Sequence, residues 1–324
     1  MPPTLTYALL RAFVVRAFHR AGVSEAEAGQ AADALVTTDA WGGFEHGTVL
    51  LPGYLRRLQA GGLHANAVPH LVAEGPGWGI VDGRAGLPMT AAAFAMQKAL
   101  AKSRACGIGY VGVRNSGPVG AAGYYAWQAA REGQIGLSFG NERPSLALAE
   151  TRSAVIGANP VAYAIPAGRH PPLLLDTAIG APAAPEGPSA IGPLDHALAL
   201  LIETLAAALS GAAFTWRIGD WNGDDAAQPT QHGGAFLAIQ IGAIATAAEF
   251  ARRMEAIVDE LGAAPRVDGK PLPTVPGAAA WEHHRRAMRD GFLLPAEVQR
   301  ALHTSATLVG LNPDEELAAA PPPV

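Results

Sequence analysis

The first 66 residues carry the hydrophobic spacing of helices. Leu5, Leu9 and Phe13 recur at every fourth position, which places them on one face of a helix. A second helix is expected after Ser24 and Glu27, which form a capping box. Beyond the segment WGGFEHG, leucines at positions 50, 51 and 58 predict a third, short helix that ends at two glycines, 61–62. This part of the chain is therefore expected to be helical.

The pattern changes between residues 68 and 175, where short apolar runs alternate with alanine-rich stretches. Helices are predicted at 90–103 and 120–131. Strand-like runs lie at 70–73, 79–81, 109–113, 135–138, 162–165 and 173–175. Strands that alternate with helices indicate an α/β domain.

A stretch rich in proline, glycine and alanine, 177–196, is predicted to be a loop. Asp195 is expected to cap an amphipathic helix that carries Leu198, Leu205 and Leu209 on one face and ends at Gly211. A polar stretch follows at 217–234. The pattern then predicts a buried strand at 236–244, a helix at 247–261 and two short helices near 281–289 and 295–304.

Composition narrows the class of protein. The 324 residues are 49% hydrophobic and 16% charged, which is enough apolar material for a large core. A net charge of −5 without a basic run argues against a nucleic-acid partner. No apolar run approaches the roughly 20 residues that cross a bilayer, and no signal peptide is recognised, so no membrane partner is expected. Cys106 is the single cysteine, which excludes an intramolecular disulfide and favours a cytoplasmic location.

One glycine-rich motif has the spacing of a dinucleotide fingerprint in the wrong surroundings. The fingerprint needs a strand before it and a helix after it, so that a pyrophosphate meets free helix N–H groups. Around GIGYVG, 107–112, the predicted helix comes first and the strand follows. No cysteine or histidine cluster has metal-ligand spacing either, so no metal site is predicted.

Two side chains are candidates for acid–base chemistry. His46 lies on a glycine-flanked loop, where an imidazole can face a cleft; the alternative is a hydrogen-bonded structural histidine. Asp176 ends the apolar strand LLLD, a position that often presents a carboxylate to a site; the alternative is a turn or helix-cap aspartate. As a pair, Asp176 would hold the tautomer of His46 and stabilise its charged form.

Long motifs spread over nearly the whole chain resemble those of the malate/L-lactate dehydrogenase-type family of NAD(P)-dependent oxidoreductases. Ureidoglycolate dehydrogenase, 2,3-diketogulonate reductase and cyclic imino acid reductases belong to that family. The matching stretches, in collinear order, are DAWGGFEHGTVLLPGYLRRLQAGGL, VDGRAGLP, ACGIGYVGVRNS, REGQIGLS, GNERP, IGANPVAYAIP, LLLDTA, ALALLIETLAAALSGA and EFARRMEAIVDEL.

The resemblance implies a fold that differs from a standard Rossmann domain. A mixed-sheet cofactor-type α/β domain, 67–194, would sit on a helical, dimer-forming domain built from both chain ends, 1–66 and 195–324. Homodimers are usual in the family. Its members reduce a 2-oxo or cyclic 2-imino acid with a nicotinamide hydride; histidines supply the proton and an arginine grips the substrate carboxylate.

The resemblance also assigns site residues position by position. His46 falls on the first family histidine, Tyr54 on the pocket tyrosine and Asp176 on the aspartate that partners the histidine. Ser116 matches the serine of the family motif Asn-Ser-x-His-x-Gly, and the residues that follow it, 117–120, are called the opening loop here. If a nicotinamide cofactor is bound, the contacting positions are Asn141, Gly157, Asn159 and Pro160.

Four positions depart from the family pattern. Glu45 replaces the serine before the histidine and offers a second acid–base group in the same loop. Leu50 stands where the family has the substrate arginine, Pro118 where it has the second histidine, and Asp195 where it has the lysine of Gly-Gly-His-Lys-Gly. The 177–194 region is also shorter than in the family.

These departures have physical consequences. Leu50 cannot pair with a carboxylate, and the loss of a charge-assisted bidentate contact costs several kcal/mol of binding. Pro118 has no side-chain proton to give, and Asp195 would repel a nearby phosphate.

Three functions remain open from the sequence. The first is a repurposed small-molecule enzyme in which His46 and Asp176, with Glu45, carry out proton transfer, elimination or hydrolysis. The second is an NAD(P)-dependent dehydrogenase or reductase with an altered substrate. The third is a non-catalytic relative that acts as a binding or scaffold protein.

Overall fold

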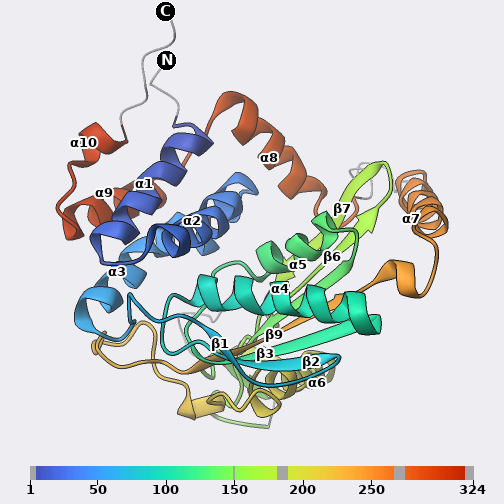
Figure 1. The fold of residues 1–324 in the computed structure, drawn as a ribbon, viewed down its shortest axis with the longest axis horizontal. Helices are drawn as coiled ribbons and strands as arrows, with labels where there is room; N and C mark the ends of the chain where they lie inside the picture. The colour runs from blue at the N-terminus through green and yellow to red at the C-terminus, as the bar shows by residue number, and fades with distance from the viewer. Residues whose placement is uncertain (1–4, 149, 181–188, 266–273, 318–324) are drawn as a thin grey trace, which may run out of the picture.

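Both ends of the chain contribute to one group of helices. The computed structural model describes residues 5–148, 150–180, 189–265 and 274–317. Figure 1 shows the N-terminal and C-terminal helices packed together on one side of the molecule. Thr6 and Ser24 cap the first two, each accepting a backbone N–H with its hydroxyl. The helices of this group are α1 (Tyr7–Arg20), α2 (Glu25–Ala40), α3 (Leu51–Ala60), α8 (Ala278–Asp290), α9 (Ala296–Leu308) and α10 (Pro313–Glu316).

A seven-stranded mixed sheet forms the other part of the molecule. Its strand order is β1-β2-β3-β9-β4-β6-β7; β2 and β3 run parallel, and all other neighbours run antiparallel. The strands are β1 (His70–Gly75), β2 (Trp78–Asp82), β3 (Ile108–Ser116), β4 (Ile135–Gly140), β6 (Val161–Ala167), β7 (His170–Thr177) and β9 (His232–Ile239). A separate parallel pair joins β5 (Leu146–Leu148) to β8 (Ser189–Ile191). The predicted α/β fold with a mixed sheet and a helical part built from both ends is confirmed.

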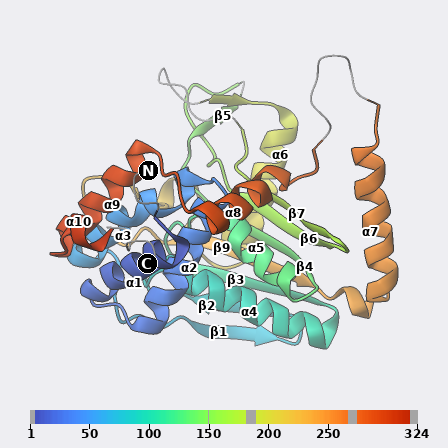
Figure 2. The ribbon, with the colours of Figure 1, turned by 90° about the horizontal axis from the view of Figure 1, so that it is seen from above.

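Helices cover both faces of the sheet, as Figures 1 and 2 show. The helices α4 (Pro88–Cys106) and α5 (Ala122–Arg131) pack on one face, and α6 (Pro193–Glu203) with the turn Thr204–Ala208 packs on the other. Side chains of β9 alternate between the two cores: Phe236 and Ala238 join the α4–α5 side, and Ala235 and Leu237 join the α6 side. The sheet is therefore a buried middle layer.

The glycine-rich motif at 107–112 has a packing role. A Cβ on Gly109 would overlap the backbone carbonyl of Ala99, so glycine lets α4 lie directly against β3. Gly112 is similarly crowded by the side chains of Tyr110 and Ser210. As the sequence indicated, the motif lies after helix α4 and runs into strand β3, so it does not precede a helix as a dinucleotide fingerprint does.

Three sequence predictions after residue 194 need correction. The assignment of 195–324 to the helical part is wrong for β9, which lies between β3 and β4 in the sheet. The strand runs from His232 to Ile239 and not over the predicted 236–244. It begins earlier because Gly233 fits closely against the carbonyl of Ala206, where a Cβ would overlap. Gly192, not Asp195, is the N-cap of α6; Pro193 takes the first helical position and Asp195 lies in the first turn. The predicted loop 177–196 lies partly outside the described residues.

Asp39 anchors the loop that carries His46. Its carboxylate is 2% exposed and accepts hydrogen bonds from the backbone N–H and the hydroxyl of Thr48, the latter at 2.6 Å. A Cβ on Gly47 would overlap this carboxylate, so only glycine lets the loop backbone lie this close to Asp39. Burial raises the pKa of Asp39 from 3.8 to about 7, while the bonds from Thr48 lower it.

This buried carboxyl predicts a pH-dependent stability. Between pH 3.8 and about 7 the folded chain holds a proton on Asp39 that the unfolded chain has lost, so stability falls as the pH rises through this range. We expect the free energy of unfolding of the wild type, relative to Asp39→Asn, to fall by up to about 1.4 kcal/mol per pH unit in that window. Urea unfolding at several pH values measures the difference. Asp224→Asn, at an exposed loop position, is the control, and a flat difference for Asp39→Asn would contradict the assignment.

Candidate functional site

His46 lies at the surface beside the opening loop 117–120. It ends the 3₁₀ turn Phe44–His46, and both Glu45 and His46 are exposed. Gly120 has φ +76°, and a Cβ there would come within 3.1 Å of the backbone oxygen of His46. The structure therefore brings the two predicted site loops into contact.

Asp176 caps the helix that follows the opening loop. Its carboxylate accepts the backbone N–H of Gly123 at 2.8 Å and also that of Ala122, the first two residues of α5. The preceding residue, Ala121, has no side chain that could do so. The helix-cap alternative for Asp176 is thus what the structure shows.

The same carboxylate also lies within electrostatic range of His46. Solvent reaches Asp176, although protein surrounds it on most sides, and this desolvation raises its pKa from 3.8 to about 6. The helix N–H groups and the charge of His46 lower its pKa, and Glu45 raises it. Among the described residues no hydrogen bond joins His46 to Asp176, so their catalytic pairing stays a prediction.

Two buried tyrosines hold the opening loop from below. The Tyr54 hydroxyl donates to the backbone oxygen of Pro118, and the Tyr125 hydroxyl donates to that of Val119, both at 2.8 Å. Neither tyrosine has exposed surface, and burial raises the pKa of both. The place of Tyr54 in a substrate pocket stays a prediction; in the structure it supports the loop.

The other predicted pocket residues are apolar or enclosed. Leu50 and Pro118 are half-buried, and Leu50 packs against the main core. Ser116 is 5% exposed, and its Oγ has no hydrogen-bond partner among the described residues. Arg57, on the same helix as Tyr54, cannot replace the missing arginine because its guanidinium is bound to backbone oxygens of Asp220, Trp221 and Gln228.

The predicted cofactor residues are used inside the protein. The Asn141 amide accepts from Gly233 N at 2.7 Å and donates to Ala213 O at 2.8 Å. The Asn159 amide accepts from Glu142 N and donates to Ala199 O and to the Glu203 carboxylate. Both side chains are buried. Gly157 lies against the carbonyl of Glu142, and Pro160 lies against Gly140. These residues brace the sheet, and both side-chain amides are engaged by the protein itself.

The N-terminus of α6 is an unfavourable place for a diphosphate. A hollow of about 200 Å³ there is lined by Leu148, Glu150, Ile191, Gly192, Pro193 and His196. A helix N-terminus attracts anions. Here, however, Glu150 lines the hollow and Asp195 lies in the first turn, so two carboxylates oppose an anionic ligand. Together with the engaged amides, this set does not fit the diphosphate of a nicotinamide dinucleotide.

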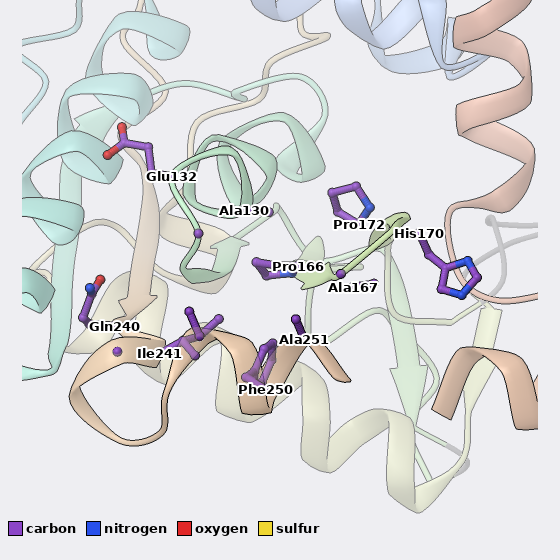
Figure 3. Close-up of a pocket in the computed structure, with 14 residues that line it drawn as sticks. Ala130, Glu132, Pro166, Ala167, His170, Pro172, Gln240, Ile241, Phe250 and Ala251 are labelled. Atoms are coloured by element: carbon purple, nitrogen blue, oxygen red, sulfur yellow. The ribbon is translucent and has the colours of Figure 1, made fainter. Parts of the chain in front are cut away.

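A larger cavity lies away from His46. It has a volume of about 500 Å³ between the end of α5, the β6–β7 turn and α7 (Ala247–Gly262). Figure 3 shows the apolar side chains of Pro166, Ile241 and Phe250 around it. Because Asp176 meets the opposite end of α5, this cavity is separate from the candidate site.

Sequence reasoning missed a second pair of titratable groups, Glu142 and His232. The His232 imidazole is buried, with Nδ1 2.9 Å from Thr230 Oγ1 and Nε2 3.5 Å from the carboxylate of Glu142. Ninety residues separate Glu142 and His232, and no motif joins them, so only the pairing of β9 with its neighbours could reveal the contact.

The described residues contain no group of three or more histidine, cysteine, aspartate or glutamate side chains able to hold a metal ion. No described helix has the length and apolar character needed to cross a membrane.

Comparison with known proteins adds the family. A model of the malate/L-lactate dehydrogenase family matches residues 5–185 and 195–303. The malate dehydrogenase of Pyrococcus abyssi is 39% identical over 169 residues, 52% of this chain and 46% of that enzyme. The chain thus spans about half the length of this curated relative. A Δ¹-pyrroline-2-carboxylate/Δ¹-piperideine-2-carboxylate reductase of Pseudomonas putida is 28% identical over 326 residues, 90% of this chain and 92% of that enzyme.

Solved structures agree with the fold. The malate dehydrogenase of Pyrococcus horikoshii OT3 superposes with a TM-score of 0.88 and 26% identity, covering 95% of this chain and 96% of that one. The sulfolactate dehydrogenase of Methanocaldococcus jannaschii shares the fold at a TM-score of 0.89 and 24% identity, covering 96% and 99%. With the family model matching most of its length, the chain belongs to the malate/L-lactate dehydrogenase family.

Proposed function

We propose that this chain is a small-molecule enzyme of the family with a remodelled site, in which His46 transfers a proton to or from a substrate without a carboxylate. The observation that carries the proposal is the exposed imidazole of His46 within electrostatic range of the Asp176 carboxylate. Asp176 stabilises the imidazolium that forms when His46 accepts a proton. Glu45 adds a second exposed carboxyl in the same turn.

Within the described part of the chain, the site lacks a free cationic side chain to bind a carboxylate, which supports a substrate without a carboxylate. Leu50 is neutral, and the Arg57 guanidinium is occupied by three backbone oxygens. Proton transfer beside the carbonyl or imine of a small neutral molecule needs no such side chain. A homodimer, which the resemblance implies, belongs to the same proposal, and light scattering of the purified protein measures it.

A second candidate, an NAD(P)-dependent dehydrogenase with an altered substrate, is supported by the close likeness to solved malate dehydrogenases over nearly the whole chain. It requires the dinucleotide to bind although the amides of Asn141 and Asn159 are engaged. The third, a non-catalytic relative, is favoured only if neither proton exchange nor dinucleotide binding is found.

The role of His46 is tested by hydrogen–deuterium exchange. Dihydroxyacetone and 1-pyrroline, a neutral ketone and a neutral cyclic imine, are incubated with the protein in D₂O and followed by proton NMR. We expect the protein to exchange the hydrogens beside the C=O or C=N group, and His46→Ala to lower the rate by about 100-fold or more. His303→Ala, an exposed histidine on α9, should leave the rate unchanged. Full activity of His46→Ala would exclude this role.

Asp176 predicts the pH dependence of the same reaction. Its pKa of about 6 means that the charged form exists above pH 6 and is neutralised as the pH falls through that value. We therefore expect exchange to decline below about pH 6. Asp176→Asn keeps an oxygen to accept the α5 N–H groups but has no charge, so its rate should be about 10- to 100-fold lower and should decline at a different pH. An unaltered pH profile in Asp176→Asn would assign the decline to another group.

Dinucleotide binding separates the first two candidates. In fluorescence titrations with NADH and NADPH, we expect no saturable binding by the wild type, because two carboxylates oppose a diphosphate at α6. Asp195→Lys reverses one of these charges and should introduce measurable binding, whereas Asp224→Lys in an exposed loop should not. Micromolar binding by the wild type would favour the altered-substrate dehydrogenase.

A further inference from the structure

We propose that Glu142, oriented by His232, is the second proton-transfer residue of this site and takes over the role of the side chain absent at Pro118. This inference rests on the proposed function and extends it to a residue at the other end of the opening loop.

The backbone places His232 beside the start of that loop. His232 opens β9 and pairs with Ser116, the last residue of β3, after which the chain enters Gly117 and Pro118. Directly opposite residues of an antiparallel pair point to the same side of a sheet. Thr230 Oγ1 is also close, 3.7 Å from a Cβ built on Gly117. The imidazole therefore lies on the same side of the sheet as Ser116, at the start of that loop.

One hydrogen bond and one longer contact with a carboxylate assign the tautomer of His232. Its Nε2 faces the Glu142 carboxylate at 3.5 Å and its Nδ1 faces the Thr230 hydroxyl at 2.9 Å. A carboxylate accepts, so Nε2 carries the proton, and Nδ1 accepts from the hydroxyl. Acid–base pairs are often this long before a substrate binds. The His232 side chain is 2% exposed and that of Glu142 is 37% exposed, so the carboxyl is the member that can touch a substrate.

The backbone of Glu142 is fixed from two sides. Its N–H donates to Asn159 Oδ1 at 2.9 Å, and its carbonyl lies so close to Gly157 that no side chain fits there. Two family-type positions, Gly157 and Asn159, thus hold Glu142 in place. A carboxyl that must meet a substrate in one orientation needs such support.

The charges around Glu142 leave its carboxyl available. The carboxylate is close enough to Tyr54 to raise the pKa of that hydroxyl, which is bonded to Pro118. The neighbouring Arg143 points elsewhere, with its guanidinium on the backbone oxygen of Ile218 and over the Trp216 ring. Glu142 and His46 thus approach the opening loop from its two ends.

The two residues complete a balanced proton transfer. The Glu142 carboxylate takes the proton of a C–H bond next to a carbonyl, and the electron pair of that bond forms a carbon–carbon double bond. The carbonyl π electrons move to oxygen, which receives the proton of the His46 imidazolium to give an enol. The reverse step returns both protons, so no oxidant or reductant is needed.

The test uses the exchange assay with dihydroxyacetone and 1-pyrroline on the full chain. We expect Glu142→Gln to lower kcat by about 100-fold with little change in KM, and Glu142→Asp to retain a rate within about ten-fold of the wild type. His232→Phe should lower kcat, and His232→Gln, which keeps a donor toward Glu142, should recover part of it. Glu297→Gln, an exposed glutamate on α9, is the control, and thermal melting monitors folding.

The outcomes separate this inference from the proposed function. If Glu142→Gln keeps full kcat while His46→Ala loses it, the assignment of Glu142 is wrong and the role of His46 stands. If His46→Ala keeps full kcat, the proposed function is wrong. Equal losses in Glu142→Gln and Glu142→Asp, accompanied by lower melting temperatures, would show a structural role and also overturn the inference. A wild type that exchanges neither compound overturns both.

Discussion

The site depends on how the backbone polar groups of residues 118–123 are satisfied. Tyr54 and Tyr125 donate to the carbonyls of Pro118 and Val119, and Asp176 accepts the N–H groups that open α5. A buried backbone group without a partner costs a few kcal/mol, so each of these three side chains is needed for the loop to keep its shape. None of the contacts involves the side chain at 118. The shape of the loop therefore does not depend on which side chain stands at position 118.

The same reasoning gives motif residues a structural role of their own. The side-chain amide of Asn141 bonds to the backbone of β9, and the amide of Asn159 joins α6 to the loop after β4. Replacing either would leave buried backbone groups unpaired, whether or not a dinucleotide binds. Their presence in the chain is thus evidence for the fold. Evidence for the reaction has to come from exposed groups such as His46 and Glu142.

Much of the fold could be predicted because periodicity reports on local structure. The helices at both ends and the strands from 70 to 175 follow from apolar spacing and caps such as Ser24. The place of β9 could not be predicted this way. Its first residues, His232, Gly233 and Gly234, read as a turn, and their burial depends on flanking strands from distant parts of the chain. The sequence predicts too late a start for α6, because Asp195 resembles a cap residue while the helix begins after Gly192, at Pro193.

The site residues could be predicted only where their immediate sequence neighbours mark them. His46 stands out in sequence because glycines flank it, and the structure leaves it exposed. Asp176 stands out at the end of a strand, yet its partners on α5 lie more than fifty residues away and could not be read from spacing.

Glu142 and His232 give no sequence signal, since each looks like an ordinary polar residue of a turn. Their contact arises because β9 lies between β3 and β4, so that the residue opening β9 meets the loop leaving β4. A strand inserted late in the chain between two earlier ones thus brings together side chains that no local motif can pair. In such a sheet, departures from a family pattern have to be judged by which new neighbours the changed positions acquire.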